Sequence, residues 1–406
     1  MSSGWESAPL RGLCEFHNGL WTGKNGPFET ATVIRNTNFT PDGRIDLSDV
    51  AVLQVEARHL AKRRLQKGDI IIEKSGGGPK QPVGRVALFE LDAANYSFSN
   101  FTSAIRVKNP KALDPTYLHR VLYWWYVSGL TEPLQRRSTG IRNLDFDAYK
   151  DLEVPLPPLE EQKRIVAKLD QAFAALDRAR TNAEANLADA SQLGAVATEQ
   201  LFPNDDTTVA GNPLDELCEA IVDCEHKTAP TQERGIPSIR TPNVGKGVLL
   251  LDGVNRVSEE TYREWTRRAE PRPGDLILAR EAPAGNVAVI PEEMRVCLGQ
   301  RTVLLRPKNE LFIPAYLAHL LLRPSSQARL LAHSRGATVQ HINVKDIRAF
   351  RISSLPSLSA QRAVVRGVEG LMAQEQSLID SYSRKLADIA ALRQSLLHAA
   401  FSGQMT

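Results

Sequence analysis

The clearest pattern in the chain is a pair of long segments in which apolar residues recur at alternating steps of three and four. The first segment covers residues 157–202 and the second covers residues 356–401, and the two align without a gap at an offset of 199. This spacing places one apolar stripe along one face of an α-helix, as in a coiled-coil seam. The residues expected at the seam are Ile165, Leu169, Leu176 and Leu187 in the first helix and Val364, Val368, Leu371, Leu386 and Ile389 in the second.

Both segments follow a proline-containing turn, which is typical of a helix start, and we expect spacer helices at 157–203 and 356–402. At 1.5 Å per residue each helix would be ~60 Å long, and a helix with so narrow an apolar stripe needs a partner. The simplest partner is the other copy of the repeat, paired antiparallel. A dimeric coiled coil, or docking against another subunit, would use the same stripe.

The segments before the helices, residues 9–156 and 213–355, carry short apolar runs bounded by Gly, Pro, Asn or Asp, which predicts β-rich domains with a few helices. The two copies share a Gly-Asp pair before an apolar run, at Gly68-Asp69 and Gly274-Asp275. The predicted fold class is therefore α+β. Two β-rich domains are joined by two long antiparallel coiled-coil helices, with an internal pseudo-two-fold repeat.

The composition agrees with a globular chain of two to three domains. The 406 residues include 42% hydrophobic and 24% charged residues, and no apolar run reaches the ~18 residues that a transmembrane helix needs. Residues 1–10 lack the basic start and apolar stretch of a signal peptide, and the four cysteines are too few for a disulfide framework. We therefore expect a cytoplasmic protein without contact to a membrane.

Two basic clusters occupy equivalent places in the repeat, within residues 62–67 and 263–272. The net charge of +3 is too small to indicate a nucleic-acid partner by itself. A single run of this kind is usually a solvated surface, but its recurrence favours phosphate contact. The residues predicted to bind DNA in these clusters are Arg63, Arg64, Arg267 and Arg268.

Other polar residues are weaker candidates for DNA contact. Arg35 and Asn38 recur as Arg240 and Asn243, which favours a shared task, either phosphate contact or a structural hydrogen bond. Two cations, Lys74 and Arg280, follow the Gly-Asp run and carry the same two alternatives. Residues that differ between the copies are better candidates for base discrimination, and these include Lys80, Gln81 and Arg85, the last of which aligns with Asn286. A glycine-rich loop at 76–83 is either a base reader or a plain surface loop.

Catalytic and metal-binding patterns are missing from the sequence. There is no methyltransferase Asn/Asp-Pro-Pro-aromatic tetrad and no GxGxxG loop, and residues 19–25 fail the spacing of a phosphate loop. Glu161 and Lys163 have no partner Asp nearby for nuclease chemistry. Cys218, Cys224 and His226 are irregularly spaced and lack a fourth zinc ligand. We predict no catalytic residue, no metal site and no cofactor in this chain.

The helix starts at 155–166 and 355–365, the Gly-Asp pairs and the closing segment 392–403 together resemble the specificity (S) subunit of Type I restriction–modification enzymes. The resemblance implies that 9–156 and 213–355 are target-recognition domains. Each would read one half of a bipartite, asymmetric site on double-stranded DNA.

The same resemblance assigns the conserved helices two tasks, which are to space the two arms and to dock two methyltransferase (M) subunits. S-adenosylmethionine would be bound by those partners, and ATP and Mg would be bound by a separate restriction (R) subunit. Two alternatives stay open at this point. One is a protein-interaction scaffold without DNA specificity, and the other is a fused enzyme, against which the missing motifs count.

Overall fold

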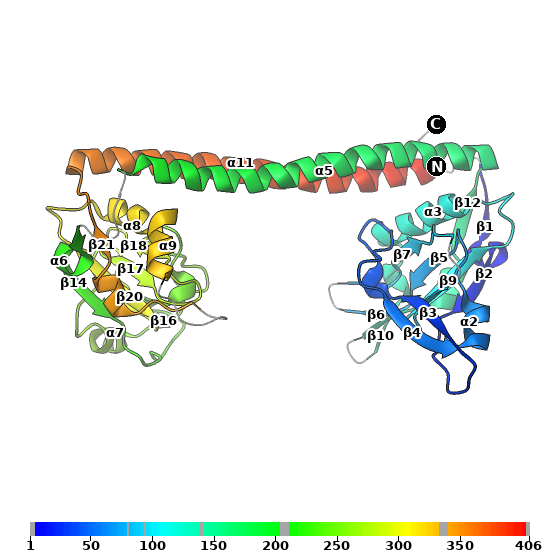
Figure 1. Ribbon diagram of the computed structural model, residues 1–406, viewed down its shortest axis with the longest axis horizontal. Coiled ribbons are helices and arrows are strands. Elements are labelled where there is room, and N and C mark those ends of the chain that lie inside the picture. The colour runs from blue at the N-terminus through cyan, green and yellow to red at the C-terminus, as the bar shows by residue number, and fades with distance from the viewer. Residues whose placement is uncertain are drawn as a thin grey trace. The chain divides into compact units, whose positions relative to one another are not determined.

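A computed structural model of the chain describes residues 5–78, 81–92, 95–138, 141–203, 211–332 and 340–402. The chain forms two compact units. The first unit combines Met1–Ala183 with Arg384–Thr406, and the second is Glu184–Ser383. Each unit contains one β-rich domain and one segment of each long helix (Figure 1). The predicted α+β class with its internal repeat is confirmed.

Each domain is built on a four-stranded antiparallel sheet. The strand order is β2-β9-β5-β7 in the first domain and β14-β20-β17-β18 in the second, so the two sheets have equivalent topologies. The strand that follows the Gly-Asp pair is fully buried in both domains, because helices and a second sheet cover its two faces. The bounds are β2 Cys14–Asn18, β5 Ile70–Glu73, β7 Val86–Leu88 and β9 Thr102–Val107, then β14 Cys218–Asp223, β17 Leu276–Ala279, β18 Val287–Val289 and β20 Thr302–Pro307.

A smaller three-stranded sheet stands beside each main sheet, ordered β4-β3-β8 and β16-β15-β19. Short strand pairs, β1 with β12 and β13 with β21, close each domain where its long helix begins. The first domain has a further sheet, β10-β11-β6, which includes part of the glycine-rich loop. The bounds are β1 Glu6–Pro9, β3 Phe28–Ile34, β4 Ala51–Glu56, β6 Ser75–Gly77, β8 Tyr96–Phe98, β10 Gln135–Ser138, β11 Ile141–Leu144, β12 Glu153–Leu156, β13 Asn212–Pro213, β15 Ile236–Ile239, β16 Arg256–Val257, β19 Cys297–Leu298 and β21 Arg351–Ile352.

Short helices complete the domains. In each unit one of them, α3 or α8, packs between the main sheet and the long helices and joins them into one hydrophobic core (Figure 1). Helix α3 begins where the Asp114 carboxylate accepts a hydrogen bond from the Tyr117 N–H, a side-chain N-cap. The bounds are α1 Leu10–Leu13, α2 Ala57–Arg63, α3 Pro115–Val127, α4 Phe146–Lys150, α6 Leu214–Leu217, α7 Glu259–Trp265, α8 Pro314–Leu322, α9 Pro324–Leu331 and α10 Val344–Arg348, with 3-10 turns η1 Asn36–Asn38, η2 Glu132–Leu134 and η3 Thr241–Asn243.

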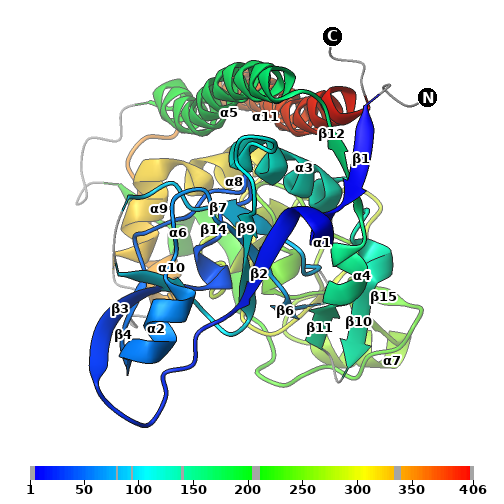
Figure 2. The same cartoon turned by 90° about the vertical axis from the view of Figure 1, so that its right-hand side faces the viewer.

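The two long helices are α5, Leu159–Leu201, and α11, Leu358–Phe401. In each unit their segments lie side by side and run in opposite directions (Figures 1 and 2). No helix among the described residues is long and apolar enough to cross a membrane.

The predicted seam residues divide into two groups. Ile165, Leu169 and Val368 are at most 1% exposed and belong to the hydrophobic cores of their domains. Leu176 and Val364 pack against the same cores and are partly buried. These five residues, predicted at the coiled-coil seam, share their clusters with the end of the other long helix and also pack against the domains, because α3 or α8 lies against the same face. The other predicted seam residues are half-buried, and these are Leu187, Leu371, Leu386 and Ile389.

The C-terminal end of each long helix packs against a short helix of one domain. Phe401, at the end of α11, packs edge-on against Tyr117 of α3 with ring centroids 5.7 Å apart. Its repeat equivalent Phe202, just after α5, packs against Tyr316 of α8 at 5.4 Å. Each domain core therefore contains the end of the helix that follows the other domain in the sequence.

A buried glutamine anchors the start of each long helix. The Gln162 side-chain carbonyl accepts from the Asp114 N–H at 2.8 Å, and its amide donates to the carbonyls of Ala112 at 3.0 Å and Pro157 at 2.9 Å. Gln361 repeats the three bonds with the Ile313 N–H at 2.8 Å and the carbonyls of Leu311 and Pro356 at 2.7 and 2.9 Å. Both side chains are fully buried. They fix the angle at which each helix leaves its domain.

Candidate nucleic-acid interface

The Gly-Asp pairs shared by the two copies are structural. Asp69 is 1% exposed and accepts two hydrogen bonds from the Arg106 guanidinium, at 2.7 and 2.6 Å. In the second domain Arg306 donates to Asp275 in the same way, at 2.9 and 2.7 Å. These bidentate pairs connect the turn before β5 or β17 to the neighbouring strand. Sequence analysis missed the arginines, although Arg106 and Arg306 also recur in the repeat.

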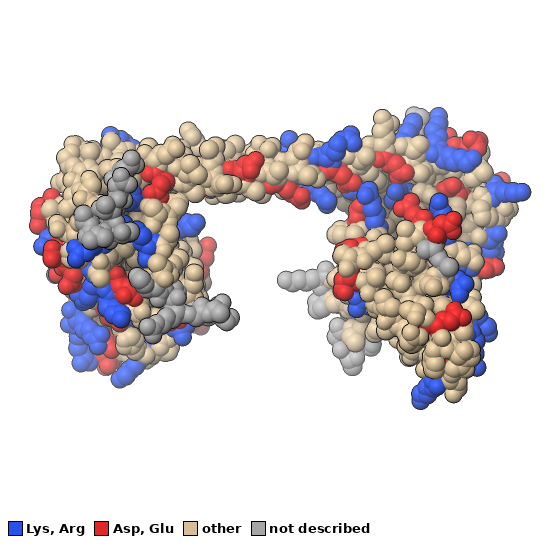
Figure 3. Space-filling view, in the orientation of Figure 1, with Lys and Arg blue, Asp and Glu red and all other residues tan. Residues whose placement is uncertain are grey.

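The two basic clusters lie at the ends of equivalent helices, α2 in the first domain and α7 in the second. Arg64, Arg267 and Arg268 are exposed, and each pairs with an exposed or half-exposed glutamate at 3.5 to 3.6 Å. Such pairs are weak in water, so the positive charge stays available to a ligand. Figure 3 shows Lys and Arg gathered on the second domain where Figure 1 labels α7. Other exposed cations of the clusters are Lys62, Lys67, Arg263 and Arg272.

Arg63 lies partly inside its domain. Its Nε donates to the Asn18 carbonyl at 3.1 Å, and its own carbonyl accepts from the Ser97 hydroxyl at 2.9 Å. The end of α2 is therefore bonded to the end of β2 and to β8. In the second domain Tyr262 of α7 shares a small hydrophobic cluster with Cys297 of β19. The basic helix end adjoins the smaller sheet in both domains.

Lys74 and Arg280 occupy equivalent positions and make equivalent contacts. The Lys74 ammonium donates to the Asn18 side-chain oxygen at 3.0 Å, and Arg280 Nη1 donates to both carboxylate oxygens of Asp223 at 3.0 and 3.1 Å. Arg280 is only 9% exposed and also donates to the Ile342 carbonyl. Burial, and secondarily the positive charge of Lys150, lower the pKa of Lys74. The structure thus favours the structural alternative for both cations.

The residues of the recurring Arg-Asn pairs differ in how far their side chains are available to a ligand. Asn38 is 3% exposed, accepts from the Arg35 N–H and donates to two backbone carbonyls of the following loop. Its amide therefore has a structural role, and the predicted DNA contact of Asn38 is not supported. Asn243 repeats the contact with the Arg240 N–H at 3.2 Å. Arg35 pairs with Asp49, whereas the Arg240 side chain is exposed and remains a candidate for DNA contact.

Arg85, one of the residues predicted to discriminate bases in the first domain, has a side chain that is only 17% exposed. Arg85 pairs with the 1% exposed Glu73 at 2.9 and 3.1 Å and donates to the Asn36 carbonyl at 3.0 Å. Its repeat equivalent Asn286 donates to the Val244 carbonyl at 2.9 Å, in the loop that matches the one after η1. The two residues differ in type but donate to equivalent loops, so the structure favours a structural role for Arg85 over base readout. Lys80 lies outside the described residues.

The cysteines are buried thiols. Burial raises the pKa of Cys14, Cys218 and Cys297 to about 12, and Cys224 accepts a hydrogen bond from the Arg301 N–H at 3.1 Å. Within the described ranges no cluster of three His, Cys, Asp or Glu side chains could hold a metal ion.

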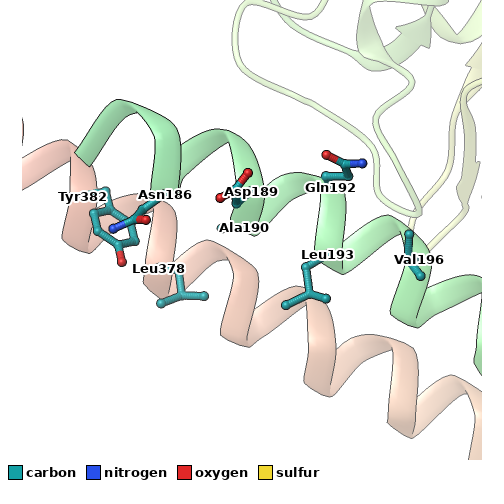
Figure 4. A pocket seen from close by; sticks show the side chains of 8 residues that line it. All are labelled: Asn186, Asp189, Ala190, Gln192, Leu193, Val196, Leu378 and Tyr382. Carbon is teal, nitrogen blue, oxygen red and sulfur yellow. The ribbon is translucent and has the colours of Figure 1, made fainter. Parts of the chain in front are cut away.

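The helix pair carries an apolar surface in the second unit. A shallow hollow of about 460 Å³ is lined from both helices, by Leu193 and Val196 of α5 and by Leu378 and Tyr382 of α11 (Figure 4). Leu193 is 68% exposed, Val196 49% and Leu378 45%. Exposed apolar side chains in a row are a feature of surfaces that bind another protein.

The sequence matches the family described as Type I restriction modification DNA specificity domain, over residues 2–186 and 229–379. The chain belongs to this family. The two matched segments fall in the two halves of the repeat. Membership in a family defined by DNA specificity supports the non-catalytic role expected from the sequence.

Curated relatives are specificity subunits. The chain is 26% identical to the Type I restriction enzyme EcoBI specificity subunit of Escherichia coli over 66% of its own length and 62% of that protein. It is 23% identical to the EcoKI specificity subunit of Escherichia coli strain K12, over 100% of its own length and 90% of that protein.

Solved structures share the fold. A chain of a type I R-M system is 22% identical, with a TM-score of 0.77 and 99% of both chains covered. The HsdS subunit of Thermoanaerobacter tengcongensis is also 22% identical, with a TM-score of 0.61, and 99% of this family member and 98% of that chain are covered.

Proposed function

We propose that this protein is the DNA sequence-recognition subunit of a Type I restriction–modification complex, in which each domain reads one half of a bipartite, asymmetric site. The observation that carries the proposal is the recurrence of an exposed basic helix end at equivalent places in two domains that otherwise differ in sequence. Phosphate contacts need only positive charge and can be shared, whereas base readout requires side chains that differ between the arms.

The helix pair would space the arms and bind the partners. Two methyltransferase subunits carrying S-adenosylmethionine would dock on it, and a restriction subunit using ATP and Mg would join for cleavage. The exposed Leu193, Val196 and Leu378 support a docking role for the pair. The same apolar surface is what favours the second candidate, a protein-interaction scaffold without DNA specificity.

Methylome sequencing of cells that carry this chain with its methyltransferase tests the proposal. The expected result is a methylated motif of two defined parts separated by a gap. Replacing residues 9–156 with the first domain of another family member should change one half of the motif only. A complex that assembles and methylates without any sequence preference would support the scaffold, and methyl transfer by this chain alone would contradict the assignment of S-adenosylmethionine to the partners.

A further inference from the structure

In each domain, the turn before the main-sheet strand that comes last in the chain, β9 or β20, is held by the same hydrogen bonds. These are the β8–β9 turn, residues 99–101, and the β19–β20 turn, residues 299–301. The Ser99 N–H donates to the Ile34 carbonyl at 2.9 Å, and the Thr102 hydroxyl donates to the Ser99 carbonyl at 2.7 Å. In the second domain the Gly299 N–H donates to the Ile239 carbonyl at 2.8 Å, and the Thr302 hydroxyl donates to the Gly299 carbonyl at 2.7 Å.

The other end of each turn is fixed in the same way. The Lys74 N–H donates to the Phe101 carbonyl, and the Arg280 N–H donates to the Arg301 carbonyl, both at 2.9 Å. Thr102 and Thr302 are fully buried. The two turns are therefore anchored at equivalent points by rigid strands, which is the support that a specific binding element requires.

The side chains on these common anchors differ. The first turn carries an exposed Asn100 and a 46% exposed Phe101. The second carries a half-buried Gln300 and an Arg301 whose side chain is 62% exposed. Asn and Gln can pair with adenine, Arg can pair with guanine, and an apolar ring can contact the thymine methyl group. An exposed Phe at the tip of a turn contributes little to the core, so a contact with a ligand accounts for it better.

Arg301 has two features that suit a residue that contacts DNA bases. Its φ of 65° is uncommon for a residue with a side chain, and such conformations gather at binding sites. Its Nη1 lies 2.7 Å from the Glu281 carboxylate, and that pair at the surface orients the guanidinium while other N–H donors of the group can bind a base.

Each turn also adjoins a basic helix end. The Gln300 amide donates to the His226 carbonyl at 3.4 Å, in the loop whose Glu225 pairs with Arg268. In the first domain Ser97, two residues before the turn, donates to the Arg63 carbonyl. Cations able to bind the phosphate backbone thus lie near side chains able to contact base edges. Specific DNA recognition needs both, because phosphate contacts position the protein and base contacts give the specificity.

We propose that the β8–β9 turn and the β19–β20 turn each read base pairs of one half-site, with Asn100 and Phe101 in one arm and Gln300 and Arg301 in the other. This inference rests on the proposed function. Its test is an exchange of turns in the complete complex with the methyltransferase partners. The N100Q/F101R variant gives the first arm the residues of the second, and Q300N/R301F is the reciprocal change.

The readout is the methylated motif, determined by sequencing. N100Q/F101R should alter one or a few adjacent positions of one half-site and leave the other half and the gap unchanged. Leu130→Arg, an apolar-to-cation change at a 47% exposed position of the same unit, is the matched control and should leave the motif intact. An active N100Q/F101R complex with the original motif would overturn the inference and leave the proposed function standing. A wild-type complex without a two-part motif would overturn the proposed function itself.

Single changes keep the inference testable if an exchanged turn impairs folding. Arg301→Gln and Phe101→Leu preserve the anchoring bonds, which use backbone atoms. Arg301→Gln should reduce discrimination at one base pair by about tenfold or more in selection from a random DNA pool, because it removes a bidentate pair. Phe101→Leu replaces the ring by a smaller apolar group and should reduce discrimination at the base pair that the ring contacts. Unchanged discrimination in both variants would refute the assignment.

Discussion

The glutamine at the start of each long helix offers the sharpest test of how the domains hold the helices. In Gln162→Ala the Asp114 N–H and the carbonyls of Ala112 and Pro157 lose their partners. A buried polar backbone group left without a partner costs ~1–3 kcal/mol. Even at the lower end, three such groups amount to about 3 kcal/mol. We expect the free energy of unfolding of the first unit to fall by that amount.

Urea denaturation followed by circular dichroism gives the size of the change, and hydrogen–deuterium exchange gives its place. A loss of about 3 kcal/mol corresponds to a ~100-fold drop in the protection of amides that exchange by opening of the first unit, because ~1.4 kcal/mol is a factor of ten. Gln361→Ala should produce the same drop in the second unit, because Gln361 makes the same three bonds.

Two controls separate hydrogen bonding from other effects. Gln162→Met keeps the length and volume of the side chain and should destabilise the first unit about as much as alanine does. Gln171→Ala, at an exposed position of α5, should stay within ~0.5 kcal/mol of the wild type. The reasoning fails if Gln162→Ala costs less than this control, or if its loss of protection appears equally in both units.

Three further predictions concern DNA binding, pH and the helices. Arg64→Ala and Arg267→Ala should weaken binding of the assembled complex to all DNA sequences alike. Each change should reduce the slope of log affinity against log salt concentration by about 0.9. A loss of affinity confined to the specific site would contradict phosphate contact. Burial, helped by the Arg120 guanidinium, holds the pKa of His119 at about 3, well below its ordinary 6.5. Below pH 6.5 the unfolded chain therefore binds a proton at His119 that the folded chain does not, so the free energy of unfolding falls as pH drops from 6.5 toward 3. His119→Gln should make this fall shallower in urea denaturation at a series of pH values. An unchanged dependence of the unfolding free energy on pH would exclude His119 as its source. Inserting four residues after Ala183 and four after Tyr382 lengthens both helices by ~6 Å and should widen the gap in the methylated motif by roughly two base pairs. An active variant with the original gap would refute the spacing role of the helices.

The sequence by itself determined the repeat, the two long helices and the β-rich character of the domains. These features depend on local periodicity, since steps of three and four can satisfy only a helix and short apolar runs between turn residues favour strands. The recurrence of the basic clusters was also visible, and the structure places both at the ends of equivalent helices, α2 and α7.

The tertiary structure alone decided which polar residues remain available to a ligand. Arg85, Arg280 and Asn38 have the right chemistry for DNA, but each is bonded inside its domain to groups distant in sequence, such as the Asn36 carbonyl 49 positions from Arg85. A charged or amide group that leaves water must find partners, and those partners are set by the packing of strands.

The same holds for the apolar stripe. Its period predicted a seam but could not tell a neighbouring helix from a domain core, because both present an apolar surface. Only the folded chain shows that Ile165, Leu169 and Val368 are buried in the domain cores, while Leu187 and Leu386 lie half-buried on the helix pair. The face that a stripe covers depends on what tertiary contacts place against it, and those contacts join residues far apart in the sequence.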